Sequence, residues 1–368
     1  MSIFIPSLRG GGAERVMLTL ANGFAVRGHH VDLVLVKAEG PYLTHVNPAV
    51  RIVDLDSTGV IRCLPSLVRY IRRNRPDSIL SAMSHANIAA IAARMIARVP
   101  LRLVISERAS LSGAERHLTT LKDRILFALM RRLYSRADAI TVVAKAITDE
   151  LVDRFRLDPT IIHMIHNPIV SDELRHKALE PPGHPWFEDV GIPIILGAGR
   201  LSRQKDFPSL IRAFALVRKT RNARLMILGE GADRQQLEQL AEDLGCASDV
   251  CLPGFIENPF AFMKGAAVFV LSSTFEGMPG TLIQAMACGT RVVSTDCPTG
   301  PREILEDGKW GPLVPMGDVG AIADAIISAL DIREGPAVEI RAAAFNEEHA
   351  VTHYLEVMGA APFASDRA

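Results

Sequence analysis

The chain has 368 residues, of which 48% are hydrophobic and 22% charged, and its formal net charge is zero. This length exceeds one ordinary hydrophobic core and suits two domains of roughly 150 to 200 residues each. The apolar fraction excludes a disordered chain, and the sequence has no uninterrupted apolar run of the ~18 residues that a membrane-spanning helix needs. With balanced charge, we expect no nucleic-acid partner.

The N-terminal stretch SIFIPSL has no basic segment before it and no small-residue cleavage site after it, so it resembles a first strand rather than a signal peptide. The chain contains five cysteines, an odd number without a CxxC pair, which disfavours a disulfide framework or a zinc site. A reducing, cytoplasmic location fits this usage best.

Positive charge is concentrated in the first half. Residues 1–175 hold 24 Lys and Arg against 16 Asp and Glu, whereas the remainder holds 17 against 25. The segment 121–136 combines this charge with leucine and isoleucine at helical spacing, which predicts an amphipathic helix with a basic face. Two interpretations stay open: a solvated helix face, or docking of the protein to the anionic inner face of the cell membrane.

In the first half of the sequence, predicted strands alternate with helical segments. Apolar runs predict strands at residues 3–8, 30–36, 51–55, 78–82, 102–106 and 139–143, and a helical period covers 13–27, with a turn at Gly28. Strands separated by helices imply βαβ units and a parallel sheet, whose ligands gather at the carboxyl ends of the strands. We assign residues 1–175 to one Rossmann-like domain.

A cluster of proline and glycine predicts a linker at residues 176–190. A second alternation follows, with strands at 192–198, 224–228, 250–252, 268–271 and 291–294, and helices at 207–219, 234–244 and 280–287. We therefore predict an α/β protein with two doubly wound parallel-sheet domains facing a cleft, the second over residues 191–344. A C-terminal helix at about 345–362 is expected to pack back on the first domain.

The segment GRLSRQKD, residues 199–206, directly follows a predicted buried strand. Arg200 and Lys205 then lie at the carboxyl edge of the sheet, where two cations suit a diphosphate ligand. Taken alone, such a pair is more often part of a solvated surface than of a binding site.

A second polar segment, SSTFEGMPGTLIQAMACGT at residues 272–290, joins a strand to a helix. Pro279 precedes the helix, which leaves the amides of Gly280 and Thr281 unpaired at its N-terminus, where phosphate can bind. Glu276 lies in the loop and can accept hydrogen bonds from sugar hydroxyls, while Gln284, one helical turn later, can meet a ribose hydroxyl. For a lone loop glutamate, solvent exposure is the alternative.

In order along the chain, these segments resemble the retaining glycosyltransferases of family 4, which have the GT-B fold. The resemblance covers most of the chain and includes GGGAER (10–15), Asn167-Pro168, LGEG (228–231), TDCPTGPREIL (295–305) and WGPLVP (310–315). It favours members that build bacterial lipopolysaccharide or other surface polysaccharide.

The resemblance implies a catalytic set of Arg200 and Lys205 on the donor diphosphate and Glu276 on the sugar hydroxyls. It implies donor contacts for Gly11, Gly12, Gly229, Phe255, Gly280, Thr281 and Gln284. The implied substrates are a nucleotide-diphospho-sugar and a glycan or polyprenyl-linked acceptor. No metal or other cofactor is required, because cations and helix-start amides stabilise the leaving diphosphate.

Two positions depart from the family pattern. Gln284 stands where the second acid of the E-x7-E motif is expected, so it keeps hydrogen-bonding capacity without charge. Glu107 and Arg108 occupy the region where many members carry a histidine near the sugar. We regard both, together with His85, as candidates for the acceptor cleft, although His85 is equally compatible with a structural role.

Other chemistries fit the sequence less well. Asp54-Leu55-Asp56 matches a metal-binding DxD string, with both carboxylates expected on one strand face. It lies in residues 1–175, which the resemblance makes the acceptor-binding domain, and not in the donor-binding domain at residues 191–344. A UDP-sugar is favoured over GDP-mannose as donor. The alternatives are a GDP-mannose-dependent mannosyltransferase, a sugar-nucleotide epimerase, for which no acid/base set is evident, and a catalytically silent nucleotide-sugar-binding subunit, for which Gln284 is the only hint.

Overall fold

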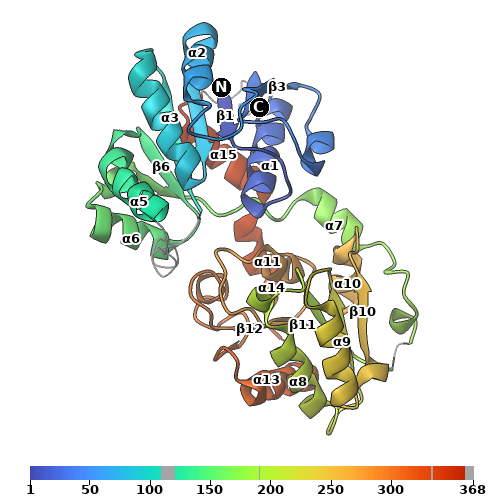
Figure 1. Cartoon of the computed structure of the whole chain (residues 1–368). Coiled ribbons are helices and arrows are strands. Elements are labelled where there is room, and N and C mark those ends of the chain that lie inside the picture. Colours follow the sequence, from blue (N-terminus) through green and yellow to red (C-terminus); the bar gives the residue numbers. More distant parts are fainter. Residues whose placement is uncertain (109–120, 190, 333–334, 361–368) are drawn as a thin grey trace. The chain divides into compact units, whose positions relative to one another are not determined.

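The computed structural model describes residues 1–108, 121–189, 191–332 and 335–360. It divides into two compact units, one formed by Met1–Pro168 with the segment from Glu347 onward, the other by Ile169–Asn346. The chain therefore passes between the units twice, after Pro168 and after Asn346. Figure 1 shows the elements of both units in their order along the chain.

The first unit contains a seven-stranded parallel sheet in the order β3-β2-β1-β4-β5-β6-β7. Its strands are β1 Ser2–Ile5, β2 Val31–Leu35, β3 Val50–Asp54, β4 Ser78–Ala82, β5 Arg102–Glu107, β6 Ala139–Val142 and β7 Ile162–Met164. The strand order reverses between β1 and β4, which makes their carboxyl ends the switch point where a doubly wound sheet binds its ligand.

Helices of the first unit form two groups, as a doubly wound sheet requires. Helices α2, α3 and α5 pack on one another, and α15 packs on α1, which it adjoins in Figure 1. The backbones of α1 and α15 approach closely: a Cβ at Gly23 would stand 2.6 Å from the Val351 side chain. The helices are α1 Gly12–Val26, α2 Leu64–Asn74, α3 Ser84–Ala97, α5 Leu121–Leu133, α6 Lys145–Phe155 and α15 Glu347–Val357.

The second unit contains a six-stranded parallel sheet in the order β10-β9-β8-β11-β12-β13. Its strands are β8 Ile194–Ala198, β9 Arg224–Leu228, β10 Val250–Gly254, β11 Val268–Leu271, β12 Val292–Thr295 and β13 Leu313–Val314. Successive strand residues enter opposite cores: Ile194 and Leu196 pack in one, and Ile195 packs in the other. This alternation explains why the strands read as continuous apolar runs.

One core of the second unit lies under α8, α9 and α13, and the other under α7, α10, α11 and α14. These helices are α7 Asp172–Ala178, α8 Phe207–Val217, α9 Arg234–Asp243, α10 Pro259–Gly265, α11 Gly280–Ala287, α13 Val319–Asp331 and α14 Val338–Ala342, with the short α12 at Pro301–Ile304. Two doubly wound parallel sheets, as predicted, form the framework of the protein.

The predicted linker is wrong. Residues 176–178 complete helix α7, and the rest of the segment packs on the second unit rather than joining the two. The Phe187 ring meets Phe262 of α10 edge to face, with 5.3 Å between the ring centroids, and the Arg224 guanidinium lies 5.2 Å from the Trp186 ring centroid. The prolines and glycine thus shape an extended strap with aromatic anchors, since they prevent regular structure without preventing burial.

The predicted basic helix is present as α5. Arg124, Arg131 and Arg132 are exposed, and so are the apolar side chains of Ile125 and Leu129. Among the described helices of both units, none has the length and apolarity to span a membrane.

Candidate active site

The site forms where β8 and β11 lie side by side in the second sheet. From this pair the strand order runs outward in both directions, so it is the switch point of the unit. The loops that follow the two strands are joined by hydrogen bonds: Ser272 Oγ donates to the carbonyl of Lys205 (2.6 Å), and the amide of Thr274 donates to the carbonyl of Gln204 (2.8 Å). Because of these bonds, Arg200 and Lys205 belong to one assembly with Glu276.

An ion pair lies at the centre of this assembly. Lys205 Nζ stands 2.6 Å from Glu276 Oε1, and the two side chains are only 15% and 10% exposed. Ser273 Oγ donates to the same carboxylate oxygen at 2.7 Å. An ion pair with this little exposure is screened less by solvent than a surface pair, so the carboxylate is held in a fixed place.

Arg200 differs from Lys205 in its surroundings. Its side chain is exposed and makes no hydrogen bond or ion pair with any residue that the structure describes. The backbone on either side is fixed, since the amide of Gly199 donates to Leu228 and that of Leu201 donates to Glu230. Arg200 therefore presents an available guanidinium from a rigid turn at the edge of the sheet.

Gly229 is required by this arrangement. Its φ is 135°, and a Cβ there would stand 2.0 Å from the carbonyl oxygen of Gly199. Its own amide donates to Gly254 at the end of β10. The residue predicted as a donor contact thus holds the turn that carries Arg200 against the neighbouring strand ends.

A third loop, after β12, supports Glu276 from behind. Thr299 Oγ1 donates to the carbonyl of Glu276, and Thr295 Oγ1 donates to the carbonyl of Ser273 at 2.6 Å. Gly300 lies so close to the Gly277 carbonyl that a Cβ there would stand 2.6 Å from the oxygen. In the same loop, burial and the charge of Glu276 raise the pKa of Cys297 to about 12, so this thiol stays protonated at neutral pH.

Helix α11 begins beside this loop with free hydrogen-bonding groups. Its N-cap is Pro279, which offers no side-chain cap, and the Thr281 hydroxyl is buried without a hydrogen-bond partner among the described residues. Gly280 and Thr281 are its first two residues, and the half-buried Gln284 follows one turn later. Uncapped amides at a helix start attract anions, as the sequence predicted for this segment.

Phe255 follows directly on Gly254, at the carboxyl end of β10, and its ring is 79% exposed. An exposed aromatic ring at the carboxyl edge of a doubly wound sheet offers a flat apolar surface to a ligand. Its role as a donor contact remains a prediction.

The glycine turn of the first unit is arranged differently from what the sequence suggested. The amides of Gly10 and Gly11 donate to Glu14 Oε2 at 2.8 and 2.9 Å, and Ser7 Oγ donates to Oε1 at 3.0 Å. The Gly11 amide is thus already paired within the chain. Around Gly12 the space where a Cβ would stand is open to 4 Å, so a ligand can approach the backbone there.

Glu107 lies at the end of β5, inside the first unit, and is 2% exposed. Its carboxylate accepts hydrogen bonds from the hydroxyl of Tyr134 (2.7 Å) and from that of Ser84 (3.1 Å). Burial and the Glu107 charge raise the pKa of Tyr134 well above its ordinary value, so the phenol stays a donor. Glu107 therefore organises the start of α3, and a contact with an acceptor remains a prediction.

The other two candidates of the first unit stand close by in the sequence and the fold. His85 follows Ser84 at the start of α3, and desolvation lowers its pKa, which favours the neutral imidazole at pH 7. Arg108 donates through Nη2 to Asn167, while its Nη1 is buried without a hydrogen-bond partner among the described residues. Burial lowers the pKa of Arg108, although a guanidinium remains charged at neutral pH.

The DxD string does not present two carboxylates on one strand face. Strand β3 ends at Asp54, whose Oδ1 accepts a hydrogen bond from the amide of Asp56 at 2.8 Å, and Asp56 has a φ of 44°. The string forms an Asx turn, for which a short acidic side chain is well suited. Within the described parts of the chain, no group of three or more His, Cys, Asp or Glu side chains is placed to hold a metal ion.

Sequence reasoning identified the charged residues of the site but missed those that hold them. Ser273, Thr299, Gln204 and Glu14 were not singled out, because a hydroxyl or amide in a loop is common and its partner lies far along the chain. Gln204, for example, donates through Nε2 to the Phe275 carbonyl, 71 residues away, at 2.9 Å. Only the position of Ser273, two residues after the end of β11, gave a local signal.

Two family models match the chain. One, described as Glycosyltransferase Family 4, covers residues 10–173, and the other, Glycosyl transferases group 1, covers residues 192–331. The chain has two doubly wound domains, and Arg200, Lys205 and Glu276 lie at the switch point of the second. Together with the two family models, this defines a glycosyltransferase of the GT-B class. The chain belongs to glycosyltransferase family 4.

Several proteins resemble the chain over nearly its whole length. A Campylobacter jejuni enzyme, N-acetylgalactosamine-N,N'-diacetylbacillosaminyl-diphospho-undecaprenol 4-alpha-N-acetylgalactosaminyltransferase, is 29% identical, with 90% of each chain covered. The structure of HepE from Anabaena in complex with UDP matches with a TM-score of 0.80 at 19% identity, covering 98% of this chain and 100% of that one. The lipopolysaccharide outer core galactosyltransferase WaaB matches with a TM-score of 0.74 at 18% identity, covering 98% and 99%.

Replacing Gly229 by alanine should destabilise the second unit by about 2 to 4 kcal/mol, because a Cβ collides with the Gly199 carbonyl and the backbone is left-handed. Gly245→Ala is the matched control, since Gly245 also has a positive φ (66°) but no neighbour within 4 Å of a Cβ. Both tryptophans, Trp186 and Trp310, lie in this unit, so their fluorescence during urea unfolding reports it. Equal losses in the two variants would contradict the steric argument.

Proposed function

We propose that the protein transfers a hexose or N-acetylhexosamine, with retention, from a nucleotide-diphospho-sugar to a glycan or lipid-linked glycan in the synthesis of cell-surface polysaccharide. The observation that carries the proposal is the Lys205–Glu276 pair, held by three loops at the switch point of the second unit. A diphosphate needs cations and a sugar needs hydrogen-bond acceptors, and this pair offers both within 2.6 Å of each other.

In this proposal, Arg200 and Lys205 neutralise the charge that develops on the departing diphosphate. The amides at the start of α11 add partial positive charge on the same group, with Gly280 and Thr281 as the contacting residues. Glu276 accepts hydrogen bonds from the sugar, and Gln284 accepts or donates one to the ribose. Lys205, Glu276 and the amides at the start of α11 are held in place before the donor binds, which avoids the energetic cost of reorganising them during the reaction.

A UDP-sugar is the favoured donor. HepE was crystallised with UDP, with UDP and glucose, and with UDP-glucose, and it shares the fold of this chain over 97% or more of its length. The exposed Phe255 ring at the end of β10 offers a stacking surface for the base, together with Gly229 and the strand ends beside it. Hydrogen bonds that distinguish uracil from guanine depend on the bound donor, which makes the nucleotide preference a matter for direct measurement.

Lipid-linked acceptors are supported by the names of two Campylobacter jejuni relatives. Both act on undecaprenol-linked glycans, and they are 29% and 28% identical to this chain over 90% and 88% of its length. In the first unit, the open backbone at Gly12 and the neutral imidazole of His85 follow β1 and β4, the strands at that sheet's switch point. We assign acceptor contacts first to Gly12 and His85. Glu107 and Arg108 come after them, because their side chains already have hydrogen-bond partners inside the unit.

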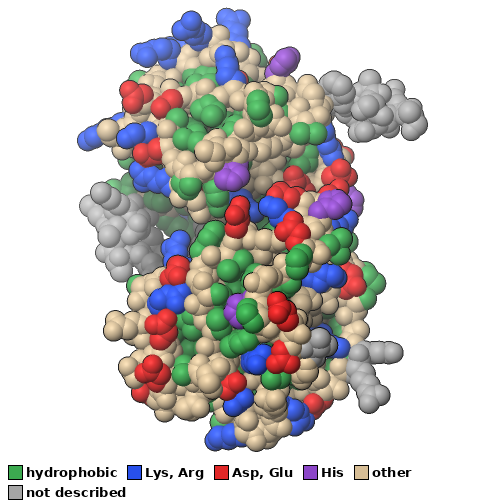
Figure 2. Space-filling model, turned by 90° about the vertical axis from the view of Figure 1, so that its right-hand side faces the viewer, with side chains coloured by type: hydrophobic (Ala, Val, Ile, Leu, Met, Phe, Trp, Pro, Cys, Tyr) green, Lys and Arg blue, Asp and Glu red, His purple; other side chains and the backbone are tan. Residues whose placement is uncertain are grey.

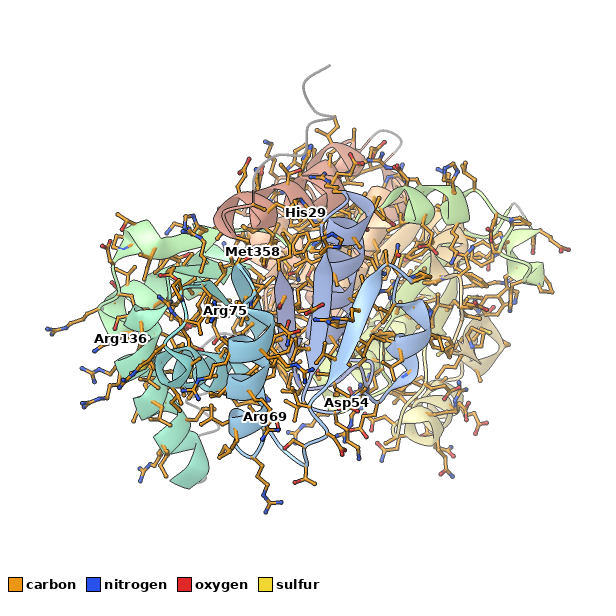
Figure 3. The ribbon with its side chains drawn as sticks, turned by 90° about the horizontal axis from the view of Figure 1, so that it is seen from above. His29, Asp54, Arg69, Arg75, Arg136 and Met358 are labelled. Atoms are coloured by element: carbon orange, nitrogen blue, oxygen red, sulfur yellow. The ribbon has the colours of Figure 1, made fainter. Side chains whose placement is uncertain are left out.

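The first unit also carries a surface suited to an anionic membrane. A groove of about 620 Å3 is lined by Leu64, Pro65, Val68, Arg69, Arg72, Arg73 and Ile96. Ile61, three residues before Leu64 in the sequence, is 89% exposed. Figure 2 shows Lys and Arg side chains gathered over the end of the unit at the top of the view. Figure 3 marks Arg69 on α2, Arg75 at the C-cap of that helix, and Arg136 after α5.

Such a combination of arginine and exposed aliphatic side chains binds anionic lipid through charge and insertion together. We therefore assign the protein a cytoplasmic location, peripheral on the inner face of the cell membrane, where a lipid-linked acceptor is within reach. The uneven charge of the two halves of the sequence favours contact of the first half, rather than the second, with anionic lipid.

Arg200→Ala and Lys205→Ala should each lower kcat/KM by about 2 to 4 kcal/mol of transition-state stabilisation, because each removes a charge from the leaving group. Sugar transfer is measured with the UDP-sugar that raises the unfolding midpoint most in a panel of UDP-Glc, UDP-Gal, UDP-GlcNAc, UDP-GalNAc and GDP-Man. Arg212→Ala, on the exposed face of α8, is the control with unchanged kinetics. Wild-type kinetics in both site variants would disprove the diphosphate assignment.

Gln284→Glu should retain or improve donor affinity, since a carboxylate is the stronger acceptor for ribose hydroxyls and the nearby helix start adds positive potential. The same change at the exposed Gln236 of α9 controls for added charge. Donor affinity is measured by titration calorimetry. A tenfold or greater loss in Gln284→Glu alone would mean that Gln284 does not face the ribose.

Arg69→Glu combined with Arg73→Glu should weaken binding to vesicles of phosphatidylglycerol and phosphatidylcholine by about tenfold or more, since each cation near such a surface contributes about 1 kcal/mol. Arg212→Glu with Lys219→Glu makes the same charge change on α8 and beyond, in the second unit, and should leave binding unchanged. Cosedimentation measures the bound fraction. Unaltered binding by the first pair would assign membrane contact elsewhere.

A further inference from the structure

The Glu276 carboxylate makes two hydrogen bonds through one oxygen. Lys205 Nζ and Ser273 Oγ both contact Oε1, at 2.6 and 2.7 Å. Among the residues that the structure describes, none donates to Oε2. One oxygen is therefore anchored within the protein, and the other is available to a sugar hydroxyl.

The hydrogen-bond donors of Lys205 are likewise shared between the protein and a ligand. An ammonium group has three N–H donors, and Glu276 takes one of them. The others remain for a phosphate, but the charge that attracts a phosphate is already partly neutralised by a carboxylate 2.6 Å away. Because both side chains are at most 15% exposed, solvent screens this neutralisation only weakly.

Donor and product experience this carboxylate differently. A bound UDP-sugar brings hydroxyls that donate to Oε2, and these hydrogen bonds offset the repulsion between the diphosphate and Glu276. After transfer the hydroxyls leave with the sugar, and the terminal phosphate of UDP carries one further negative charge near the same carboxylate. UDP then meets repulsion without any compensating hydrogen bond.

We propose that Glu276 makes the site prefer the intact nucleotide-diphospho-sugar over the spent nucleoside diphosphate, and so promotes product release. This inference rests on the proposed function, because it takes Arg200 and Lys205 as the diphosphate cations. It adds to the sugar-binding role of Glu276 a second effect, exerted through Lys205 on the nucleotide.

Ser273 and Thr299 are the positioning residues for the Glu276 carboxylate. Ser273 keeps Oε1 beside Lys205, and Thr299 fixes the backbone of Glu276 through its carbonyl. A carboxylate that moved freely would turn away from an arriving diphosphate, whereas one held on both sides remains next to it.

The test compares Glu276→Gln with the wild type, because glutamine keeps the size and hydrogen-bonding groups of the side chain but removes the charge. Titration calorimetry on the full chain without acceptor gives the dissociation constants of UDP and of the UDP-sugar selected by the thermal-shift panel. UDP should bind about tenfold or more tightly to the variant, while the UDP-sugar should bind equally well or more weakly. Asp324→Asn, exposed on α13, makes the same charge change and should alter neither constant.

Tighter binding of UDP distinguishes this effect from a loss of structure, which would weaken the binding of both ligands. Unchanged or weaker UDP binding in Glu276→Gln would overturn the inference, and the proposed function would still stand if Arg200→Ala loses UDP. Unaltered UDP binding in Arg200→Ala and Lys205→Ala would instead remove the proposed function itself. If Glu276→Gln does not fold, the wild type decides: the inference requires tighter binding of the UDP-sugar than of UDP, and the reverse order overturns it.

Discussion

The pairing of β8 with β11 is the constraint on which the site depends. These strands are far apart in the sequence, and only their parallel alignment brings Lys205 and Glu276, 71 residues apart, to the same edge of the sheet. Neither loop then stands alone, because hydroxyls and amides of one donate to carbonyls of the other. A parallel sheet with a switch point creates such a meeting place without any residue dedicated to it, which explains why unrelated chemistries use it.

The framework could be predicted because its signals are local. Buried parallel strands read as continuous apolar runs, and glycine or proline marks most of their ends, so the predicted strands at 78–82, 224–228 and 268–271 match the structure residue for residue. The linker at 176–190 failed for the same local reason. Proline and glycine indicate the absence of regular structure, but burial of Trp186 and Phe187 depends on partners elsewhere in the second unit.

The candidate site was predictable in its charges and not in its supports. Arg200, Lys205 and Glu276 could be identified because charged residues that follow a buried strand lie at the edge where a parallel sheet binds ligands. The resemblance to a family then gave each of them a role. By contrast, the pairing of the Gly10 and Gly11 amides with Glu14, and the commitment of Glu107 to Tyr134 and Ser84, follow from three-dimensional proximity. Charge in the first unit is thus used internally as well as at its surface, which a count of residues cannot distinguish.

The division of the chain has a consequence for its synthesis. The second unit is one uninterrupted stretch, Ile169–Asn346, whereas the first unit includes α15, at the far end of the chain. As the polypeptide emerges from the ribosome, the second unit has all its strands and helices before α15 is translated. Until α15 is translated, the face of α1 against which it packs stays uncovered. The apolar side chains of that face are then accessible to chaperones or to neighbouring chains. Translation thus completes the second unit first, although its residues follow most of the first unit in the sequence.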